Sequence, residues 1–208
     1  MKLTGESKIL LSILLATVAI IGSAIFLFNK PVAPTKPIAR EELVTPDSFA
    51  TGNASASAYL VEFSDFQCPA CRAFMPVVDE LITKYSDKLL FVYRHYPLSQ
   101  HAFAKPAAMA AEAAGEQGKF WEMSKLLFEN QDRFSSSLWE NLADELKLDR
   151  TKFDADLTYA DLQSKIDRDE TTAIRLRLPG TPSFFLNGIQ LTLTGPDDLK
   201  KAVEEAVQ

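Results

Sequence analysis

The feature that most constrains this chain is a run of twenty residues without a charge, Ile9 to Phe28. As a helix it spans about 30 Å, the thickness of a bilayer's hydrocarbon core. A cleavable signal peptide has a shorter apolar run, of about 7–15 residues, although Gly22-Ser23-Ala24 resembles a weak cleavage site. A buried core helix is disfavoured because no polar face interrupts the run. We therefore expect residues 1–8 to form a tail and residues 9–28 a transmembrane signal anchor.

The segment after the apolar run has the composition of a spacer. Residues 29–46 hold four prolines and no hydrophobic period, which indicates an extended, semi-rigid connection. A folded domain is then expected over residues 47–208, with ordinary globular values of 47% hydrophobic and 24% charged residues. The net charge of −6 argues against a nucleic-acid partner, because such partners select a basic surface.

From residue 47 onward, strand patterns alternate with helix patterns. The expected elements are a strand at 58–65, a helix at 69–85 kinked at Pro76, a strand at 89–96, helical stretches at 101–148 and 149–177, strands at 183–186 and 189–193, and a helix at 197–207. Asn187-Gly188 between the last two strands is a strong hairpin signal. The order is β-α-β, a large helical insertion, then β-β-α, which indicates an α/β domain.

Both cysteines lie in one Cys-Pro-Ala-Cys segment, Cys68 to Cys71, where a strand gives way to a helix. The unpaired N–H groups and partial positive charge of a helix N-terminus favour a reactive thiolate at Cys68. Cys71, one turn later, can attack a mixed disulfide formed at Cys68. Half of a zinc site is the alternative, but a tetrahedral site needs four ligands, and His95 and His101 show no ligand spacing relative to the pair. An inert pair is the other alternative, and we favour redox chemistry.

A second feature is Gly180-Thr181-Pro182-Ser183, directly before the hairpin. A proline at the start of a strand cannot donate to the ladder. A cis Thr181–Pro182 bond would present the backbone of Thr181 to a substrate chain that adds as an extra strand. An ordinary trans proline opening the strand is the alternative, and sequence statistics alone favour it.

Five segments occur in a characteristic order: Val61–Cys71, Tyr93–Leu98, Ala110–Ala114, Gly118–Glu122 and Gly180–Gly188. Together they resemble the DsbA-like branch of thioredoxin-fold proteins, over roughly residues 48–207. The resemblance implies a thioredoxin fold with a helical insertion. It also implies a periplasmic or extracytoplasmic thiol:disulfide oxidoreductase that oxidises or isomerises disulfides in exported proteins, with Thr181–Pro182 cis and packed against the cysteine pair.

This chain departs from that family at two places. The dipeptide between the cysteines is Pro69-Ala70, without the histidine of the strongly oxidising members. The segment before the turn, Leu176 to Pro179, stands where many members have a Gly-Val pair. The first departure affects the expected redox potential of the cysteine pair, and the second affects the packing expected next to the Thr181–Pro182 turn.

Glu62 lies inside the apolar strand before Cys68 and matches the position of the family's buried acid. Burial disfavours the charged carboxylate, so Glu62 near the cysteine pair could pass protons during thiol–disulfide exchange. The alternatives are a Glu62 that reaches solvent or a lysine, and Asp65 as the relay. His95 and His101 are expected in structural roles, and Phe120, Trp121, Phe128 and Trp139 in the core of the insertion.

The sequence thus predicts a membrane-anchored oxidoreductase with Cys68 as the attacking thiol, Cys71 as the resolving thiol and Thr181-Pro182 as the substrate-docking turn. No bound cofactor is expected beyond the cysteine pair. The expected partners are reduced exported proteins and a membrane quinone-linked oxidase that resets the pair. Because disulfide donors work in oxidising compartments, the domain is expected on the extracytoplasmic side. An isomerase or reductase, or a non-catalytic binder of peptides or metal, are the rival hypotheses.

Overall fold

The computed structural model describes residue 17 and residues 36–208. The predicted anchor at 9–28 lies outside the described residues, apart from Thr17, and so does the spacer before residue 36. No helix within the described residues is long and apolar enough to cross a membrane. Residues 36–208 form one compact unit.

The unit contains helices and strands in the following order: α2 (Arg40–Leu43), β1 (Phe49–Gly52), β2 (Ala58–Ser64), α3 (Pro69–Lys84), β3 (Leu89–His95), α4 (Ala104–Gly115), α5 (Phe120–Glu129), the 3-10 helix η1 (Gln131–Arg133), α6 (Ser136–Glu145), α7 (Arg150–Asp156), α8 (Ala160–Arg175), β4 (Ser183–Leu186), β5 (Ile189–Gln190) and α9 (Pro196–Ala206). The predicted helix through Pro76 and the first strand of the hairpin are present. The predicted strand at 189–193 is shorter and ends at Gln190.

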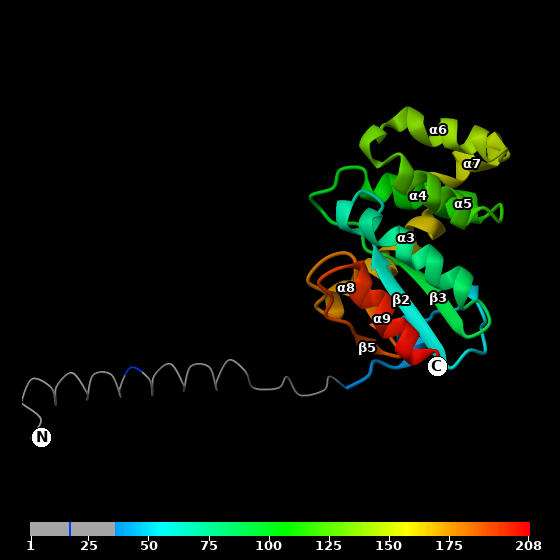
Figure 1. The fold of residues 1–208 in the computed structure, drawn as a ribbon. Coiled ribbons are helices and arrows are strands. Elements are labelled where there is room, and N and C mark those ends of the chain that lie inside the picture. Colours follow the sequence, from blue (N-terminus) through cyan, green and yellow to red (C-terminus); the bar gives the residue numbers. More distant parts are fainter. Residues whose placement is uncertain (1–16, 18–35) are drawn as a thin grey trace, which may run out of the picture. The chain divides into compact units, whose positions relative to one another are not determined.

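The strands form one sheet in the order β1-β3-β2-β4-β5 (Figure 1). β2 and β3 run parallel, and the other neighbouring pairs are antiparallel. Every residue of β2 and β3 is buried, as their apolar runs predict for strands covered on both faces. The predicted α/β architecture is confirmed.

The two faces of the sheet carry different helices. Leu60 of β2 belongs to the core cluster that includes residues of α3 and α9, which lie together on one side of the sheet in Figure 1. Val61 and Phe63 point to the other face, where they pack with Ala173 of α8. Because side chains alternate along a strand, Glu62 shares the face of Leu60, under α3. The register of β2 therefore places an acid beneath the helix that carries both cysteines.

The helical insertion, α4 to α7, lies beyond one end of the strands in Figure 1. The helical stretches predicted at 101–148 and 149–177 are divided into separate helices by turns. Gly118 and Lys147 both adopt positive φ, 74° and 56°, which ends the regular helix at each position. Asp149 then caps α7 by accepting a hydrogen bond from the backbone N–H of Lys152 at 3.0 Å.

Two short elements were not expected from the sequence. β1 pairs antiparallel with β3 at the sheet edge, and its alternating half-exposed residues end in a glycine, which gives a weak strand pattern. α2 lies in the segment assigned to the spacer, yet its Leu43 is fully buried. The compact unit begins at Lys36, further toward the N-terminus than the expected boundary at residue 47.

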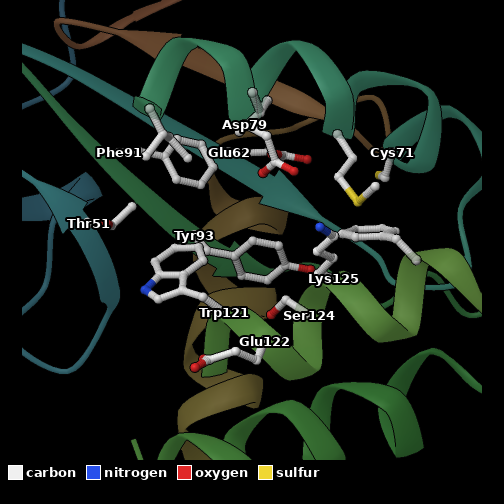
Figure 2. Close-up of a pocket in the computed structure, with 14 residues that line it drawn as sticks. Thr51, Glu62, Cys71, Asp79, Phe91, Tyr93, Trp121, Glu122, Ser124 and Lys125 are labelled. Atoms are coloured by element: carbon white, nitrogen blue, oxygen red, sulfur yellow. The ribbon is translucent and has the colours of Figure 1, made fainter. Parts of the chain in front are cut away.

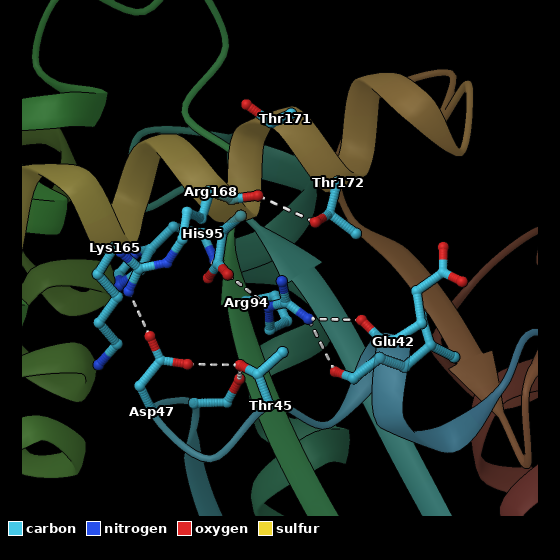
Figure 3. Close-up of polar contacts among 12 residues, drawn as sticks. Glu42, Thr45, Asp47, Arg94, His95, Lys165, Arg168, Thr171 and Thr172 are labelled. Carbon is cyan, nitrogen blue, oxygen red and sulfur yellow. Dashed lines mark hydrogen bonds and ion pairs between the residues drawn. The ribbon is translucent and has the colours of Figure 1, made fainter.

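A buried ion pair ties α2 to the rest of the unit (Figure 3). Arg94 of β3 donates from Nε to Asp169 of α8 at 2.5 Å, and its Nη1 donates to the carbonyls of Glu42 and Leu43. The second oxygen of Asp169 accepts the backbone N–H of His95 at 2.9 Å. The pair therefore satisfies backbone groups of two elements as well as its own charges.

Candidate active site

Cys68 occupies the N-cap position of α3, and Pro69 follows at the first helical position. Its backbone is extended, and its N–H donates to the carbonyl of Asp65 at 3.0 Å. Both cysteines are free thiols. Cys68 is 7% exposed and Cys71 is 1% exposed, so the first cysteine is the more accessible one. This order of accessibility agrees with the predicted roles of attacking and resolving thiol.

The two thiols have opposite acidities. A hydrogen bond from the Cys71 thiol, together with the backbone N–H groups of Cys71 and Ala70, lowers the pKa of Cys68 to about 5, against the opposing effect of burial. Burial, the hydrogen bond to Cys68 and the nearby Glu62 raise the pKa of Cys71 well above its ordinary value. The helix N-terminus thus stabilises one thiolate while the second cysteine stays protonated.

The turn before β4 brings a distant segment to the cysteine pair. The Cys68 thiol donates to the carbonyl oxygen of Thr181 at 3.3 Å, across 113 residues of sequence. The Thr181–Pro182 bond is cis, as the family resemblance implies and against the trans form that statistics favoured. Pairing of Phe63 in β2 with Ser183 in β4 sets this approach. Thr181 and Pro182 are both partly exposed.

Glu62 lies on the sheet under α3, where it is 5% exposed. Its carboxylate accepts a hydrogen bond from the Ser64 hydroxyl at 2.6 Å. Burial raises the pKa of Glu62 to about 7 despite that hydrogen bond. Glu62 is therefore almost shielded from solvent, it forms no ion pair with a lysine of the described residues, and its protonation changes near neutral pH.

Glu62 and Cys71 line the same cavity, of about 370 Å³, between α3 and α5 (Figure 2). The buried hydroxyl of Tyr93 also lines it and has no hydrogen-bond partner among the described residues. The remaining wall is largely apolar and includes Phe91 and Trp121. The cavity gives the resolving thiol and the buried acid a shared space.

Asp65, the alternative proton relay, binds backbone N–H groups and a histidine with its carboxylate. One of its oxygens accepts the N–H of Gln67 at 2.7 Å. The other accepts the N–H of Leu98 at 2.9 Å and faces His101 Nδ1 at 2.7 Å. Asp65 therefore holds the turn before Cys68, which accounts for its burial without a proton-transfer role.

The histidines lie in structural contacts, as predicted. His101 contacts Asp65, and His95 Nε2 lies 2.9 Å from the buried Glu112. Four aromatic residues were expected in the core of the insertion. Phe120, Phe128 and Trp139 are buried, as predicted. Trp121 is only partly buried and lines the cavity. Among residue 17 and residues 36–208, no three His, Cys, Asp or Glu side chains are arranged to hold a metal ion.

One contact to the site was missed from the sequence. Gln131, in η1, donates from Nε2 to the backbone carbonyl of Cys68 at 3.0 Å. A single glutamine between two helical patterns gives no periodic signal, and nothing local shows that it reaches a segment 63 residues earlier.

Comparison with known families places this geometry in context. A family model described as Thioredoxin matches residues 44–205. Among curated proteins, the Na(+)/H(+) antiporter NhaA 1 of Mycolicibacterium vanbaalenii is 36% identical over 177 residues, which cover 82% of this chain and 29% of the antiporter. NhaA 3 of Salinispora tropica is 40% identical over 147 residues, 70% of this chain and 22% of that protein. The chain thus spans less than a third of these relatives' length.

Solved structures show the same fold. A thioredoxin-like oxidoreductase from Silicibacter pomeroyi has a TM-score of 0.70 and 27% identity, covering 81% of this chain and 98% of that one. The thiol-disulfide exchange protein alpha-DsbA2 from Wolbachia pipientis has a TM-score of 0.71 and 20% identity, covering 92% and 98%. The predicted thioredoxin-like fold of the DsbA type is confirmed.

Proposed function

Because the chain belongs to the thioredoxin family, we propose that it is an extracytoplasmic thiol:disulfide oxidoreductase that introduces disulfides into exported proteins. The observation that carries the proposal is the asymmetry of the pair: Cys68, the more exposed of the two at 7%, has a pKa of about 5, and Cys71, 1% exposed, has a raised pKa. Such a pair supplies a good leaving group and a separate resolving thiol.

The proposed reaction begins from the Cys68–Cys71 disulfide. A substrate thiolate attacks the Cys68 sulfur, a mixed disulfide forms there, and Cys71 leaves. A second substrate thiolate then attacks the substrate sulfur of the mixed disulfide, and Cys68 leaves as a thiolate. The substrate has lost two electrons and the cysteine pair has gained them.

Glu62 is proposed to transfer protons to and from Cys71 during this exchange. The leaving sulfur of Cys71 needs a proton, because its thiolate is disfavoured by burial. A buried acid with a pKa of about 7, lining the same cavity, can give that proton in oxidation and take it back in the reverse direction. Thr181 and Pro182 are proposed to dock the substrate backbone beside Cys68.

Trapping tests the roles of the two thiols. With Cys71→Ser, substrate proteins that carry a disulfide should accumulate as mixed disulfides on Cys68, because the Cys68 thiolate attacks the substrate disulfide, one substrate sulfur leaves as a thiolate, and no Cys71 thiol is left to resolve the adduct. With Cys68→Ser such adducts should be absent, because Cys71 is only 1% exposed. A reversed pattern would show that the assignment of the roles is wrong. A binder without catalysis would form no mixed disulfides with either variant.

The redox potential tests the direction. A stabilised thiolate favours the reduced pair and makes its disulfide oxidising. Without a histidine between the cysteines, the potential should lie above the roughly −270 mV of thioredoxin but below that of strongly oxidising relatives. Redox titration in glutathione buffers measures it. A value at or below that of thioredoxin would favour the reductase hypothesis.

Membrane anchoring through residues 9–28 and an extracytoplasmic domain are further parts of the proposal, as is reoxidation by a membrane quinone-linked oxidase. The uncharged run supports the anchor. A cysteine introduced within residues 31–35 should react with a membrane-impermeant maleimide on whole cells with any outer membrane permeabilised. Labelling only after lysis would exclude this orientation.

A further inference from the structure

Gln131 connects the helical insertion to the backbone of the redox cysteine. It begins η1, between α5 and α6, and is only 8% exposed. Its side-chain nitrogen Nε2 donates two buried hydrogen bonds, to the carbonyl of Phe66 at 2.7 Å and to the carbonyl of Cys68 at 3.0 Å. Both carbonyls belong to the turn that leads from β2 into α3.

The carbonyl of Cys68 is the part of its backbone that most needs an anchor. Because residue 69 is proline, the peptide between Cys68 and Pro69 has no N–H, and its carbonyl is the one group through which hydrogen bonds can hold it. One contact is the N–H of Arg72 at 3.2 Å, inside the first turn of α3. The other is Gln131, which holds the plane relative to the rest of the domain.

The other hydrogen bonds that link this turn to the rest of the domain do not involve the carbonyl of Cys68. The carbonyl of Asp65 accepts the N–H of Cys68, and the Gln67 side chain accepts the N–H of Phe103 at 2.7 Å. Among residues 36–208, the side-chain hydrogen bonds to the backbone of Cys68 itself come from Gln131. A single amide therefore clamps two carbonyls, on either side of Gln67.

We propose that Gln131 is a positioning residue for the thiol chemistry: by holding the carbonyls of Phe66 and Cys68, it keeps the Cys68 sulfur over the N–H groups of the first turn of α3 and stabilises its thiolate. Those N–H groups belong to Ala70 and Cys71. Hydrogen bonds to an anion depend steeply on distance and angle, so a small rotation of the Cys68–Pro69 peptide weakens both. The biological meaning of this role rests on the proposed redox function.

The test compares two glutamine variants of the full chain. Gln131→Met keeps the length of the side chain and removes the donor. Gln117→Met is the matched control, because the Gln117 amide also bridges backbone groups, bonding to the carbonyl of Asp149 at 3.2 Å and to its N–H at 2.8 Å, elsewhere in the insertion. The Cys68 pKa is read from thiolate absorbance against pH, and the potential from titration with glutathione.

Gln131→Met should raise the Cys68 pKa by about one unit. The same loss of thiolate stabilisation should shift the equilibrium with glutathione about tenfold toward the protein disulfide, which is ~30 mV. Gln117→Met should leave both values at those of the unaltered protein. A purely structural glutamine would lower the melting temperature and move neither value, and that result would overturn the proposal.

If Gln131→Met does not fold, Gln131→Asn provides the same test, because its amide is one methylene shorter and cannot reach both carbonyls. An unchanged pKa and potential in a folded Gln131→Asn would likewise overturn the proposal. The test compares the Cys68 pKa and the potential of each variant with those of the unaltered protein. Its outcome therefore does not depend on whether the protein is an oxidase. A low potential of the unaltered protein would reject the oxidase direction. The change in Cys68 pKa and potential caused by Gln131→Met would still test the role of Gln131.

Discussion

At the scale of single residues, the site places two ionisable groups in opposite environments. Cys68 gains hydrogen bonds that favour its thiolate, whereas Glu62 is buried with one hydroxyl donor and its charged form is disfavoured. The pKa of Cys68 is lowered from 9 to about 5, and the pKa of Glu62 is raised from 4.5 to about 7. The two residues therefore make the redox pair sensitive to pH between about 5 and 7.

Replacement of Glu62 by glutamine should stabilise the reduced protein. The folded pKa of Glu62, about 7, lies above its ordinary value of 4.5, so ionisation destabilises the fold as pH rises from about 4.5 through 7. Glutamine does not ionise. Glu62→Gln should equal the unaltered protein at pH 4 and exceed its unfolding free energy by up to about 3 kcal/mol at pH 8. Urea denaturation at both pH values measures this.

Glu80→Gln is the control for that experiment, because Glu80 is an exposed acid paired with Lys200 on the surface. It should show little difference at either pH. An equal gain for Glu62→Gln at pH 4 and pH 8 would contradict the burial argument. Glu62→Gln should also slow the attack of Cys71 on a mixed disulfide at Cys68, the reverse of the first oxidation step, at neutral pH, because the proton of Cys71 then lacks its acceptor.

The thiolate of Cys68 should make the reduced form dependent on pH in the opposite sense. Its folded pKa, about 5, lies below the ordinary value of 9, so its stabilising effect is full above pH 9 and is lost as pH falls through 5. Alkylation of Cys68 by iodoacetamide should follow one titration with a midpoint near pH 5. A midpoint near 9 would show that the N-terminus of α3 does not stabilise the thiolate.

At the scale of elements, the Arg94–Asp169 pair determines how α2, β3 and α8 are joined. Both side chains are buried, and each also bonds to backbone groups. Removal of one partner leaves an uncompensated buried charge. The pair thus fixes these elements more firmly than the surface ion pairs do.

Asp169→Ala should therefore lower the unfolding free energy by about 3–5 kcal/mol, because Arg94 stays buried without its partner. Glu80→Ala, which breaks an exposed pair with Lys200, should lower it by less than about 1 kcal/mol. Chemical denaturation of both variants gives the comparison. Equal small losses would mean that water reaches Arg94 once Asp169 is gone.

At the scale of the whole molecule, the folded unit includes a segment that composition assigns to a spacer. The N–H of Ile38 donates to the carbonyl of Gly188 at 2.8 Å, and Leu43 is fully buried. Gly188 has φ of 83° and lies so close to Ile38 that a side chain would clash. Residues 38–43 are therefore part of the packed structure.

A protein beginning at Asp47 should be less stable than one beginning at Lys36. Loss of buried Leu43 alone corresponds to about 2–5 kcal/mol, which lowers the melting temperature by roughly 5–15 °C for a domain of this size. Leu43→Ala in the longer protein should account for most of the difference. Equal melting temperatures for the two lengths would place the boundary at residue 47.

Short-range patterns were sufficient for the order of the main elements and for the redox pair. Apolar runs predicted β2 and β3, helical periodicity predicted α3, and Asn187-Gly188 predicted the hairpin. The position of Cys68 between a strand and the start of a helix predicted its lowered pKa. These features depend on backbone sterics and on neighbours within a few residues, which the sequence shows directly.

The long-range contacts were decided only by the tertiary structure. The approach of Thr181 to Cys68 was implied only by the family resemblance, and the register of β2 with β4 sets it. Gln131 reaches Cys68 through the packing of the insertion, which no pattern in the sequence implied. Leu43 is buried in the apolar cluster on the α8 face of the sheet, where Arg94 donates to its backbone carbonyl. Such contacts join residues 51 to 113 positions apart. Their free energy depends on how distant surfaces fit, and no local pattern encodes that fit.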